Sequence, residues 1–293
     1  MPPDSSAAIR RVVAEHLGVS PERRVVPLTH GGDHDSYLVD DRLVVRRRRG
    51  GAVEMGVERE ARLLDLLAEV SPLPVPRPVF VAPDDGCLAY EWLDGVPLLD
   101  VHVRDADREA IAGGLGTLLR ALHDVDADRL AGLVEVDDTS GVELLELTTT
   151  EYEAAAAAEV PARARPAIEA FLAATPPPPA DALTFSHNDL GIEHVLVDPQ
   201  STQVTGVIDW SDAALTDPAR DFGLIHRDLG PEALDAALAA FAMPPGEEEG
   251  FRRRVLFHAR CALLEDLAFG VRNDRPTYVD KSLAGLSWLF SDR

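Results

Sequence analysis

The sequence predicts an α+β protein of two lobes, in which a small strand-rich lobe is followed by a larger and mostly helical one. Its 293 residues suit a single bilobal protein or two modest domains. Hairpin-like runs are concentrated in the first third, whereas helical periodicity dominates the remainder. The character of the chain changes near Glu91 to Val96, so we expect the lobes to span residues 1–93 and 94–293.

The smaller lobe is predicted to alternate helices with hairpins. A proline-rich stretch at Pro72–Pro78 cannot be helical, because each proline removes a backbone donor and restricts the residue before it. Helices are expected at Ala7–Leu17 and Glu58–Val70, and hairpin strands at Ser36–Val39, Leu43–Val45, Val79–Ala82 and Cys87–Trp92.

The larger lobe is predicted to be helical around a short stranded centre. Helices are expected at Asp105–His123, at Glu151–Glu159 and through most of the remainder to Arg293. Short strands at Thr184–Phe185 and Val204–Ile208 flank a charged loop. The run Pro176–Pro179 is expected to form a stiff connector.

Composition excludes several classes of function. The formal net charge of −23 argues against nucleic acid or an anionic membrane as a partner, because a polyphosphate surface requires a basic face. The same charge suits a cationic small molecule or metal ions. The two cysteines lack CxxC spacing, so they indicate neither a disulfide scaffold nor a zinc ribbon. The chain has neither an apolar stretch of the roughly 18 residues that a membrane span needs nor a signal-peptide pattern, so we expect a cytoplasmic protein.

Residues able to carry chemistry are concentrated in the charged loop of the larger lobe. Asp189 lies where a general base would accept a proton from a substrate hydroxyl. His194 and Asp209 would hold magnesium against triphosphate oxygens. Asp209 ends an apolar strand, which is a common way to place a carboxylate against a metal. An H-x-D, a metal ligand five residues later and a second Asp on a following strand match the phosphoryl-transfer pattern.

Features upstream occur in the order that phosphoryl transfer requires. The pair Gly31 and Gly32 precedes a hairpin, the cation Arg46 ends the next strand, and the acid Glu60 lies in the following helix. The alternative is that the loop carboxylates have only capping or turn roles, which a lone H-x-D would favour. The joint pattern favours phosphoryl transfer.

Three motifs resemble those of the aminoglycoside phosphotransferase family, which includes macrolide and other antibiotic kinases and is related to choline and protein kinases. They are His187-Asn188-Asp189-Leu190-x-x-x-His194, Val207-Ile208-Asp209-Trp210 and Asp217-Pro218-Ala219-Arg220-Asp221-Phe222. The resemblance extends from about Val26 to about Leu289. It implies a bilobal, protein-kinase-like fold and an antibiotic-resistance kinase that uses ATP or GTP with Mg²⁺.

The resemblance also implies roles for the loop residues. Asp189 resembles the catalytic base and Asp209 the metal-binding Asp. His194 occupies the place where most members carry Asn, and because magnesium prefers oxygen ligands, this imidazole is expected to loosen the second metal site or to admit Mn²⁺. His187 is expected to hold the loop through a backbone hydrogen bond, and Asp221 to brace it as a buried carboxylate.

In the smaller lobe the resemblance implies a nucleotide site. Gly31 and Gly32 would let the backbone approach the phosphates, and Arg46 would pair with them and with Glu60. Glu58 is the competing acid. The backbone groups of Glu91 and Leu93 would hydrogen-bond the purine edge, so side chains there do not distinguish ATP from GTP. The loop departs from the family in its charged residues, which are His30, Asp33, His34 and Asp35.

The acceptor is constrained only through charge and apolarity. Acids that would attract a cationic acceptor such as an aminoglycoside are Glu193, Asp212, Asp228, Glu265 and Asp266. The His at 194 favours the macrolide group, whose apolar pocket would be lined by Phe251, Phe257, Leu264, Phe269 and Trp288. An endogenous hydroxylated metabolite is the alternative acceptor. Two rival classes use the same residues: a dinuclear-metal hydrolase, with His30, His34 and Asp35 as further ligands, and a non-catalytic ligand-binding module.

Overall fold

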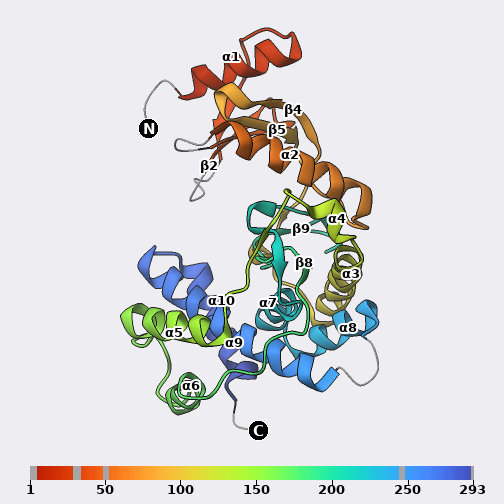
Figure 1. Cartoon of the computed structure of the whole chain (residues 1–293). Coiled ribbons are helices and arrows are strands. Elements are labelled where there is room, and N and C mark those ends of the chain that lie inside the picture. The colour runs from red at the N-terminus through yellow and green to blue at the C-terminus, as the bar shows by residue number, and fades with distance from the viewer. Residues whose placement is uncertain (1–4, 29–33, 49–52, 244–247, 292–293) are drawn as a thin grey trace.

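The computed structural model of the chain describes residues 5–28, 34–48, 53–243 and 248–291. Figure 1 shows a small lobe of strands with two helices, joined to a larger lobe built mainly of helices. The predicted α+β, two-lobed architecture is therefore confirmed. The chain leaves the small sheet after Glu91 and enters a strand pair of the larger lobe at Val96. The division at residues 93 and 94 lies within this crossing and stays a prediction.

The smaller lobe is an antiparallel sheet between two helices. Its strand order is β1-β2-β3-β5-β4. Alternate residues of one strand face opposite sides, so Cys87 and Ala89 pack with the first helix while Leu88 packs in the core that includes the second. The elements are α1 (Ser5–Leu17), β1 (Val25–Pro27), β2 (His34–Val39), β3 (Leu43–Arg48), α2 (Val53–Val70), β4 (Pro78–Ala82) and β5 (Cys87–Glu91).

The crossing between the lobes requires a glycine. Gly95 has φ of +127°, a conformation that L side chains rarely adopt. A Cβ at this position would lie 2.3 Å from Oγ1 of Thr205 and 3.0 Å from the carbonyl oxygen of Val197. The absence of a side chain therefore lets the connecting segment lie directly against the strands of the larger lobe.

Two three-stranded sheets frame the charged loop of the larger lobe. One has the order β10-β9-β6 and the other β7-β11-β8. The loop at 187–194 joins β8 to β9, and Asp209 follows β10. Because β9 and β10 are antiparallel neighbours, the end of the loop lies beside Asp209, and Ile208 N–H donates to the His194 carbonyl at 2.9 Å. The strands are β6 (Val96–Pro97), β7 (Glu135–Val136), β8 (Thr184–Ser186), β9 (Val195–Val197), β10 (Val204–Val207) and β11 (Ala214–Thr216).

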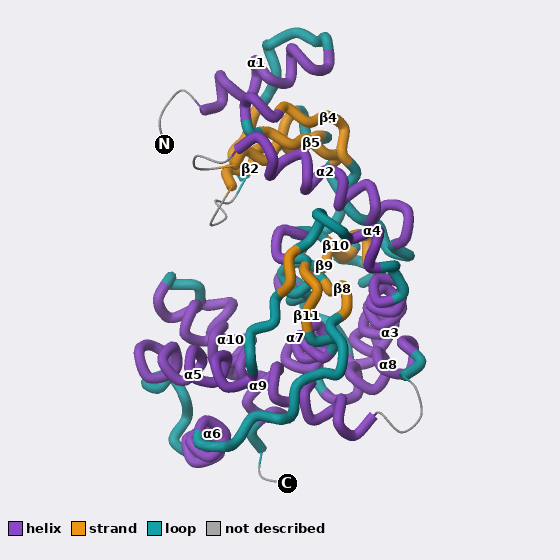
Figure 2. The backbone as a smooth tube through the Cα atoms, viewed as in Figure 1, coloured by secondary structure: helices purple, strands orange, loops and turns teal. Residues whose placement is uncertain are grey.

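Helices make up the part of the larger lobe below these sheets in the view of Figure 2. Helix α3, the first of this lobe, packs on α8, whereas α7 and α10 both pack on the long α9. A second apolar core, separate from the one under the loop, joins α5, α6, α9 and α10. The helices are α3 (Asp105–His123), α4 (Ala127–Leu130), α5 (Gly141–Glu151), α6 (Arg165–Leu172), α7 (Ala219–Leu229), α8 (Pro231–Phe241), α9 (Glu248–Arg272) and α10 (Pro276–Leu289).

Several expected elements have different boundaries. The helix predicted at Glu151–Glu159 is confirmed only over residues 151–156. It begins earlier, as α5 at Gly141, where Ser140 accepts from Glu143 N–H as the N-cap, and it continues as a π-helix over Tyr152–Ala156. The short strands β1, β6, β7, β9 and β11 were not predicted, since runs of two or three residues carry too little periodicity; the eight-residue helix α6 was not predicted either. Cys87 and Cys261 are buried free thiols. Within the described ranges, no helix is both long and apolar enough to span a bilayer.

Candidate active site

The histidine that begins the loop is a structural residue in this fold. His187 is fully buried, and both ring nitrogens are used within the protein. Its Nε2–H donates to the Ile208 carbonyl at 3.0 Å, and its Nδ1 accepts from Asp189 N–H at 3.3 Å. Burial lowers the His187 pKa to about 4, so the ring is neutral at pH 7. The side chain thus joins the loop to the segment that precedes Asp209.

A buried carboxylate supports the same loop from α7. Asp221 is fully buried, and its Oδ2 accepts from the His187 N–H at 2.8 Å. Burial raises the Asp221 pKa to about 7, against the opposing effect of the His187 N–H. Asn188, the next residue of the loop, has φ of +68°, so the chain turns sharply there and directs the following side chain outward.

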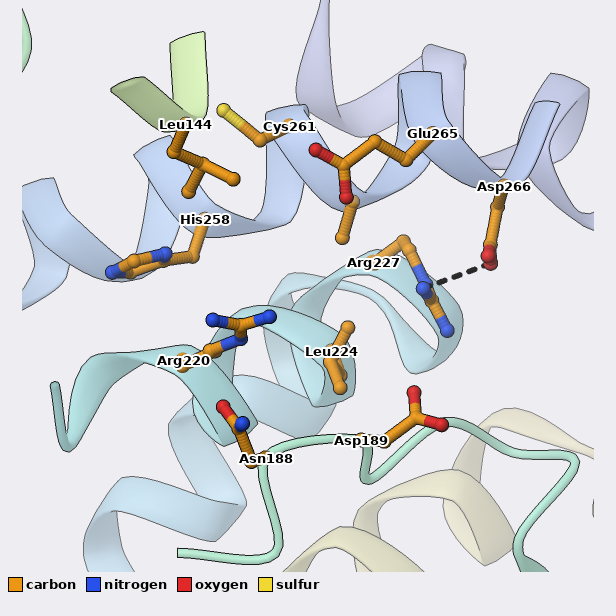
Figure 3. Close-up of a pocket in the computed structure, with 11 residues that line it drawn as sticks. Leu144, Asn188, Asp189, Arg220, Leu224, Arg227, His258, Cys261, Glu265 and Asp266 are labelled. Carbon is orange, nitrogen blue, oxygen red and sulfur yellow. Dashed lines mark ion pairs between the residues drawn. The ribbon is translucent and has the colours of Figure 1, made fainter. Parts of the chain in front are cut away.

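Asp189 lies at the floor of a small cavity between the loop and two helices (Figure 3). Its carboxylate points toward Leu224 and Arg227 on α7, while Cys261, Glu265 and Asp266 lie opposite on α9. The side chain keeps 44% of its surface exposed, because the cavity is open to solvent. Partial desolvation in the cavity nevertheless raises the Asp189 pKa to about 6, and the neighbouring imidazole of His194 opposes that rise. A carboxylate with a pKa near neutrality and an open approach can accept a proton.

His194 connects Asp189 with Asp209. Its Nδ1 lies 2.8 Å from the backbone carbonyl of Asp189, which can only accept, so Nδ1 carries the proton. The Nε2 atom therefore presents a lone pair in the neutral ring, and it lies 3.9 Å from Oδ2 of Asp209. Burial lowers the His194 pKa, but the surrounding carboxylates, led by Asp189, outweigh burial and raise it.

The donor set at His194 and Asp209 fits a divalent ion bound together with phosphates. Magnesium commonly takes one or two protein ligands and completes its shell with water and substrate oxygens. Desolvation raises the Asp209 pKa, but Arg46, His194, the Ser211 hydroxyl and His187 together lower it further, so this carboxylate resists protonation. Among the described residues no group of three or more His, Cys, Asp or Glu side chains forms a metal cluster.

The structure brings Arg46 and Glu60 together across the smaller lobe. Nη1 of Arg46 on β3 donates to Oε1 of Glu60 on α2 at 2.8 Å, and both side chains are largely buried. Nη2 of Arg46 donates to Oγ of Ser211 at 2.8 Å and lies 3.4 Å from Oδ1 of Asp209. Glu58, the competing acid, is exposed on α2. The guanidinium thus reaches from one lobe to the other, directly beside the candidate metal ligands.

A larger cavity, which we call the interlobe cavity, lies between the lobes at this guanidinium. Its volume is about 510 Å³, a size typical of small-molecule sites. Leu93 lines it, whereas Glu91 is not among its lining residues and donates its N–H to the Arg77 carbonyl at 3.3 Å. Its lining residues are Leu28, His34, Ser36, Val44, Arg46, Tyr90, Trp92, Leu93, Gly95, Pro97, Leu196, Ile208, Asp209, Ser211 and Asp212. Gly31 and Gly32, together with His30 and Asp33, lie outside the described residues.

The five acids expected to attract a cationic acceptor are found in three different settings. Asp212 lines the interlobe cavity, and Glu265 and Asp266 line the cavity at Asp189. Glu193 and Asp228 line neither cavity, and their side chains keep only 12% and 1% of their surface exposed. Of the apolar side chains expected to line a pocket, Phe251 and Leu264 belong to the cores, Phe269 is 42% exposed, and Trp288 donates Nε1–H to the His226 carbonyl.

A buried ion cluster neutralises three of these acids. Arg227 donates to Asp228 at 2.7 Å and to Asp266 at 2.8 Å. Lys281 of α10 donates to Glu193 at 2.8 Å and to Asp266 at 2.9 Å. Neither cation was predicted, because apart from the neighbouring Asp228 each lies 15 or more positions from the acids that it pairs with, and only helix packing brings α7, α9 and α10 together. Asp137, which accepts from Asn188 at 3.2 Å and from Arg220 at 2.8 Å, was not predicted either.

Comparison of the chain with known proteins identifies its family. The model of the phosphotransferase enzyme family matches residues 24–254. The chain belongs to the phosphotransferase enzyme family. The suspected relationship to antibiotic phosphotransferases is thereby confirmed at the level of the family.

The chain is also similar to solved structures of antibiotic phosphotransferases and to part of a much longer protein. A macrolide 2'-phosphotransferase from Brachybacterium faecium is 26% identical, with a TM-score of 0.63 over 95% of this chain and 97% of that one. The GDP complex of an aminoglycoside 2'-phosphotransferase-IIIa is 20% identical, with a TM-score of 0.69 over 95% and 96%, a likeness that shows the fold. Acyl-CoA dehydrogenase family member 10 of Mus musculus is 26% identical over 210 residues, which are 66% of this chain but 19% of that protein.

Proposed function

We propose that this phosphotransferase moves the γ-phosphoryl group of ATP or GTP to a hydroxyl of a small molecule. The observation that supports it best is the arrangement of Asp189, His194 and Asp209. Asp189 faces one cavity, Asp209 faces the other, and the imidazole lies between them, in contact range of both. A nucleotide in the interlobe cavity would therefore present its terminal phosphate toward an acceptor held at Asp189.

Each residue of the candidate site has a proposed role that follows from its position. Arg46, held by Glu60, would bind phosphate oxygens, and the wall at Leu93 would contact the purine. His194 and Asp209 would hold Mg²⁺ or Mn²⁺, which would neutralise charge on the triphosphate. His187 and Asp221 would fix the loop without touching substrate. Gly31 and Gly32 remain proposed phosphate-loop residues.

In the proposed reaction, Asp189 orients the acceptor hydroxyl and accepts its proton. The hydroxyl oxygen forms a bond to the γ-phosphorus as the bond from that phosphorus to the bridging oxygen breaks, and the nucleoside diphosphate leaves. Because little covalent chemistry falls to the protein, positioning and electrostatics supply most of the acceleration. Antibiotics of the kinds named for the structural relatives are the first acceptors to test, with an endogenous hydroxylated metabolite as the alternative.

The hydrolase alternative is not supported by the described part of the chain. Both ring nitrogens of His187 are bonded within the protein, which leaves no lone pair for a metal. His34 lies at Arg46 and Glu60 rather than at Asp189. The residues that the hydrolase would need are therefore divided between two places.

Substitution Asp189→Asn tests the proposal. We expect phosphate transfer to fall about 10³-fold while the affinity for nucleotide with Mg²⁺ changes less than about two-fold, because the amide keeps the shape but cannot accept the proton. Transfer is measured with labelled ATP and an acceptor panel, and affinity by titration calorimetry. Asp181→Asn, at an exposed loop position, is the matched control. Equal loss of transfer and nucleotide affinity, or absence of nucleotide binding in the native chain, would contradict the proposal.

A further inference from the structure

The charged loop ends in a tight turn that carries His194. The His194 N–H donates to the Gly191 carbonyl at 3.0 Å. The Ile192 N–H donates to Oδ2 of Asp228 at 3.2 Å. The Glu193 side chain folds back over Gly191, where an added Cβ would lie 2.5 Å from Oε2 of that glutamate. The shape of the turn and the position of the Glu193 carboxylate are therefore linked.

One cation reaches this turn from the last helix, α10. Nζ of Lys281 donates to Oε2 of Glu193 at 2.8 Å and lies 2.9 Å from Oδ2 of Asp266. A third carboxylate oxygen, Oδ1 of Asp228, is 3.8 Å away, and the ring of Tyr278 covers the ammonium at 4.7 Å from the ring centroid. The Lys281 side chain keeps only 8% of its surface exposed. The ammonium is thus enclosed by three acids and one aromatic ring.

The residue type at this position is distinctive for the chain. The sequence contains 28 lysines and arginines, and Lys281 is the single lysine among them. An ammonium is a compact charge whose three donors can face carboxylates in different directions, whereas the donors of a guanidinium lie in one plane. Arg227 shows the planar case, because it donates to both carboxylate oxygens of Asp228 at 2.7 Å. The geometry at Lys281, where acids approach from α7, α9 and the loop, fits a lysine.

Lys281 supports the opposite end of the loop from the carboxylates described above. Asp221 and Asp137 hold residues 187 and 188, at the beginning of the loop. Glu193 is 12% exposed, and its other ion pair, with Nη2 of Arg227, spans 3.9 Å. A buried carboxylate that loses its closest cation is strongly destabilised. If Lys281 were removed, Glu193 would turn toward solvent and the turn would move with it.

We propose that Lys281 is a positioning residue, which fixes Glu193 and thereby the turn that carries His194. The turn places this imidazole between Asp189 and Asp209. The proposal rests on the proposed function and adds a residue of α10, outside the segment that matches the family. Lys281 lines neither the interlobe cavity nor the cavity at Asp189, so it acts through the loop and not on substrate. Because a misplacement of about 1 Å can slow a reaction substantially, a small shift of the turn lowers the rate.

Substitution Lys281→Met tests the proposal, because it removes the charge and keeps a long side chain. We expect kcat to fall about ten-fold or more and the KM for nucleotide to change less than about three-fold, since Arg46 and Asp209 lie outside the turn. Arg260→Met is the matched control. Arg260 of α9 donates to the Leu289 carbonyl at 2.8 Å, so it joins the same two helices at the end of α10, and its loss is expected to leave kcat within about two-fold. Rates are measured with labelled ATP, Mg²⁺ and kanamycin or a macrolide, whichever the native chain phosphorylates.

A second substitution, in the loop, separates positioning from a general structural role. Glu193→Gln replaces the buried carboxylate by a neutral amide, which requires no cation. Added to Lys281→Met, it is expected to raise kcat at least about three-fold above that of Lys281→Met alone. A lysine that only joined α9 to α10 through Asp266 would give no such recovery. If Lys281→Met does not fold, recovery of folded and active protein in the double variant supports the proposal, and its absence overturns it.

Hydrogen exchange supplies a measurement that needs no acceptor, and it alone decides if the native chain phosphorylates neither antibiotic. In Lys281→Met we expect the amides of residues 190–194 to exchange faster than in the native chain, whereas in Arg260→Met they keep the native rate. Unchanged exchange in Lys281→Met, equal loss of kcat in the two single variants, or a double variant no faster than Lys281→Met overturns the inference and leaves the proposed function standing. Absence of nucleotide binding in the native chain contradicts the proposed function and the inference that rests on it.

Discussion

The imidazole of His194 donates from Nδ1 to the backbone carbonyl of Asp189, and its Nε2 lies 3.9 Å from Oδ2 of Asp209. In the neutral ring this one hydrogen bond fixes the tautomer, joins the proposed base to the proposed metal ligand, and leaves the lone pair of Nε2 on the side of Asp209. An Asn at the same place would offer an amide oxygen instead, which is a harder ligand.

Substitution His194→Asn is therefore expected to change metal preference. We expect the ratio of the transfer rate in Mg²⁺ to that in Mn²⁺ to rise roughly ten-fold, because the oxygen ligand suits magnesium better than the imidazole does. Steady-state rates at saturating concentrations of each metal check this. His16→Asn, on α1, is the control, and an unchanged ratio in His194→Asn would show that the ring is not a ligand.

Substitution Arg46→Met is expected to raise the KM for nucleotide about ten-fold or more, because a charge-assisted contact to phosphate is lost. Arg47→Met is the control. Arg47 follows Arg46 in β3, so its side chain points to the opposite face of the sheet. Initial rates as a function of nucleotide concentration distinguish them. A similar KM in both variants would remove Arg46 from the nucleotide site.

Substitution Asp137→Asn is expected to lower kcat about ten-fold with little change in the KM for nucleotide. Asp137 accepts from both Asn188 and Arg220 through Oδ2, so its charge holds the loop in which Asn188 has a positive φ. Asp126→Asn, at an exposed site, is the control. If the KM rises instead while kcat is unchanged, Asp137 does not position the loop.

Substitution Arg227→Met is expected to destabilise the fold by about 3–5 kcal/mol, because buried Asp228 and Asp266 lose their closest cation. Arg253→Met, at a side chain 68% exposed, is expected to cost less than about 0.5 kcal/mol. Urea unfolding of the two variants measures the difference. Equal midpoints would show that Lys281 alone sustains the cluster.

Acidification is expected to destabilise the protein partly through His123. Burial lowers the His123 pKa to about 4, and Nε2 has no hydrogen-bond partner among the described residues. Between pH 6.5 and 4 the unfolded chain binds a proton that the folded ring rejects, so stability falls as pH falls through this window. The loss approaches about 3 kcal/mol per such ring at pH 4.

Substitution His123→Leu removes this contribution while the one from His187 remains. We therefore expect the free energy of unfolding to fall less steeply between pH 6.5 and 4 than in the native chain. Urea unfolding at several pH values measures the slope. Identical slopes in the two proteins would show that His123 is protonated in the folded state.

Local patterns in the sequence determined much of the fold and the order of the site. Hairpin-like runs predicted β2, β3, β4 and β5 of the smaller lobe, and α3 spans the residues that helical periodicity indicated. The sequence pointed to three candidate site residues because each lies within a few residues of an apolar strand. They are Asp189, His194 and Asp209. Strands, helices and short motifs can be read from the sequence because each depends on backbone geometry within a few neighbouring residues.

Only the tertiary structure decided which charges are available to a substrate. In sequence Glu193, Asp228 and Asp266 are acids like any others, but helix packing places Arg227 and Lys281 against them. Pairing depends on contacts between α7, α9 and α10, whose relative positions follow from burial of apolar faces and not from local spacing. The cavities at Asp189 and between the lobes have the same origin, because segments far apart in the chain form their walls.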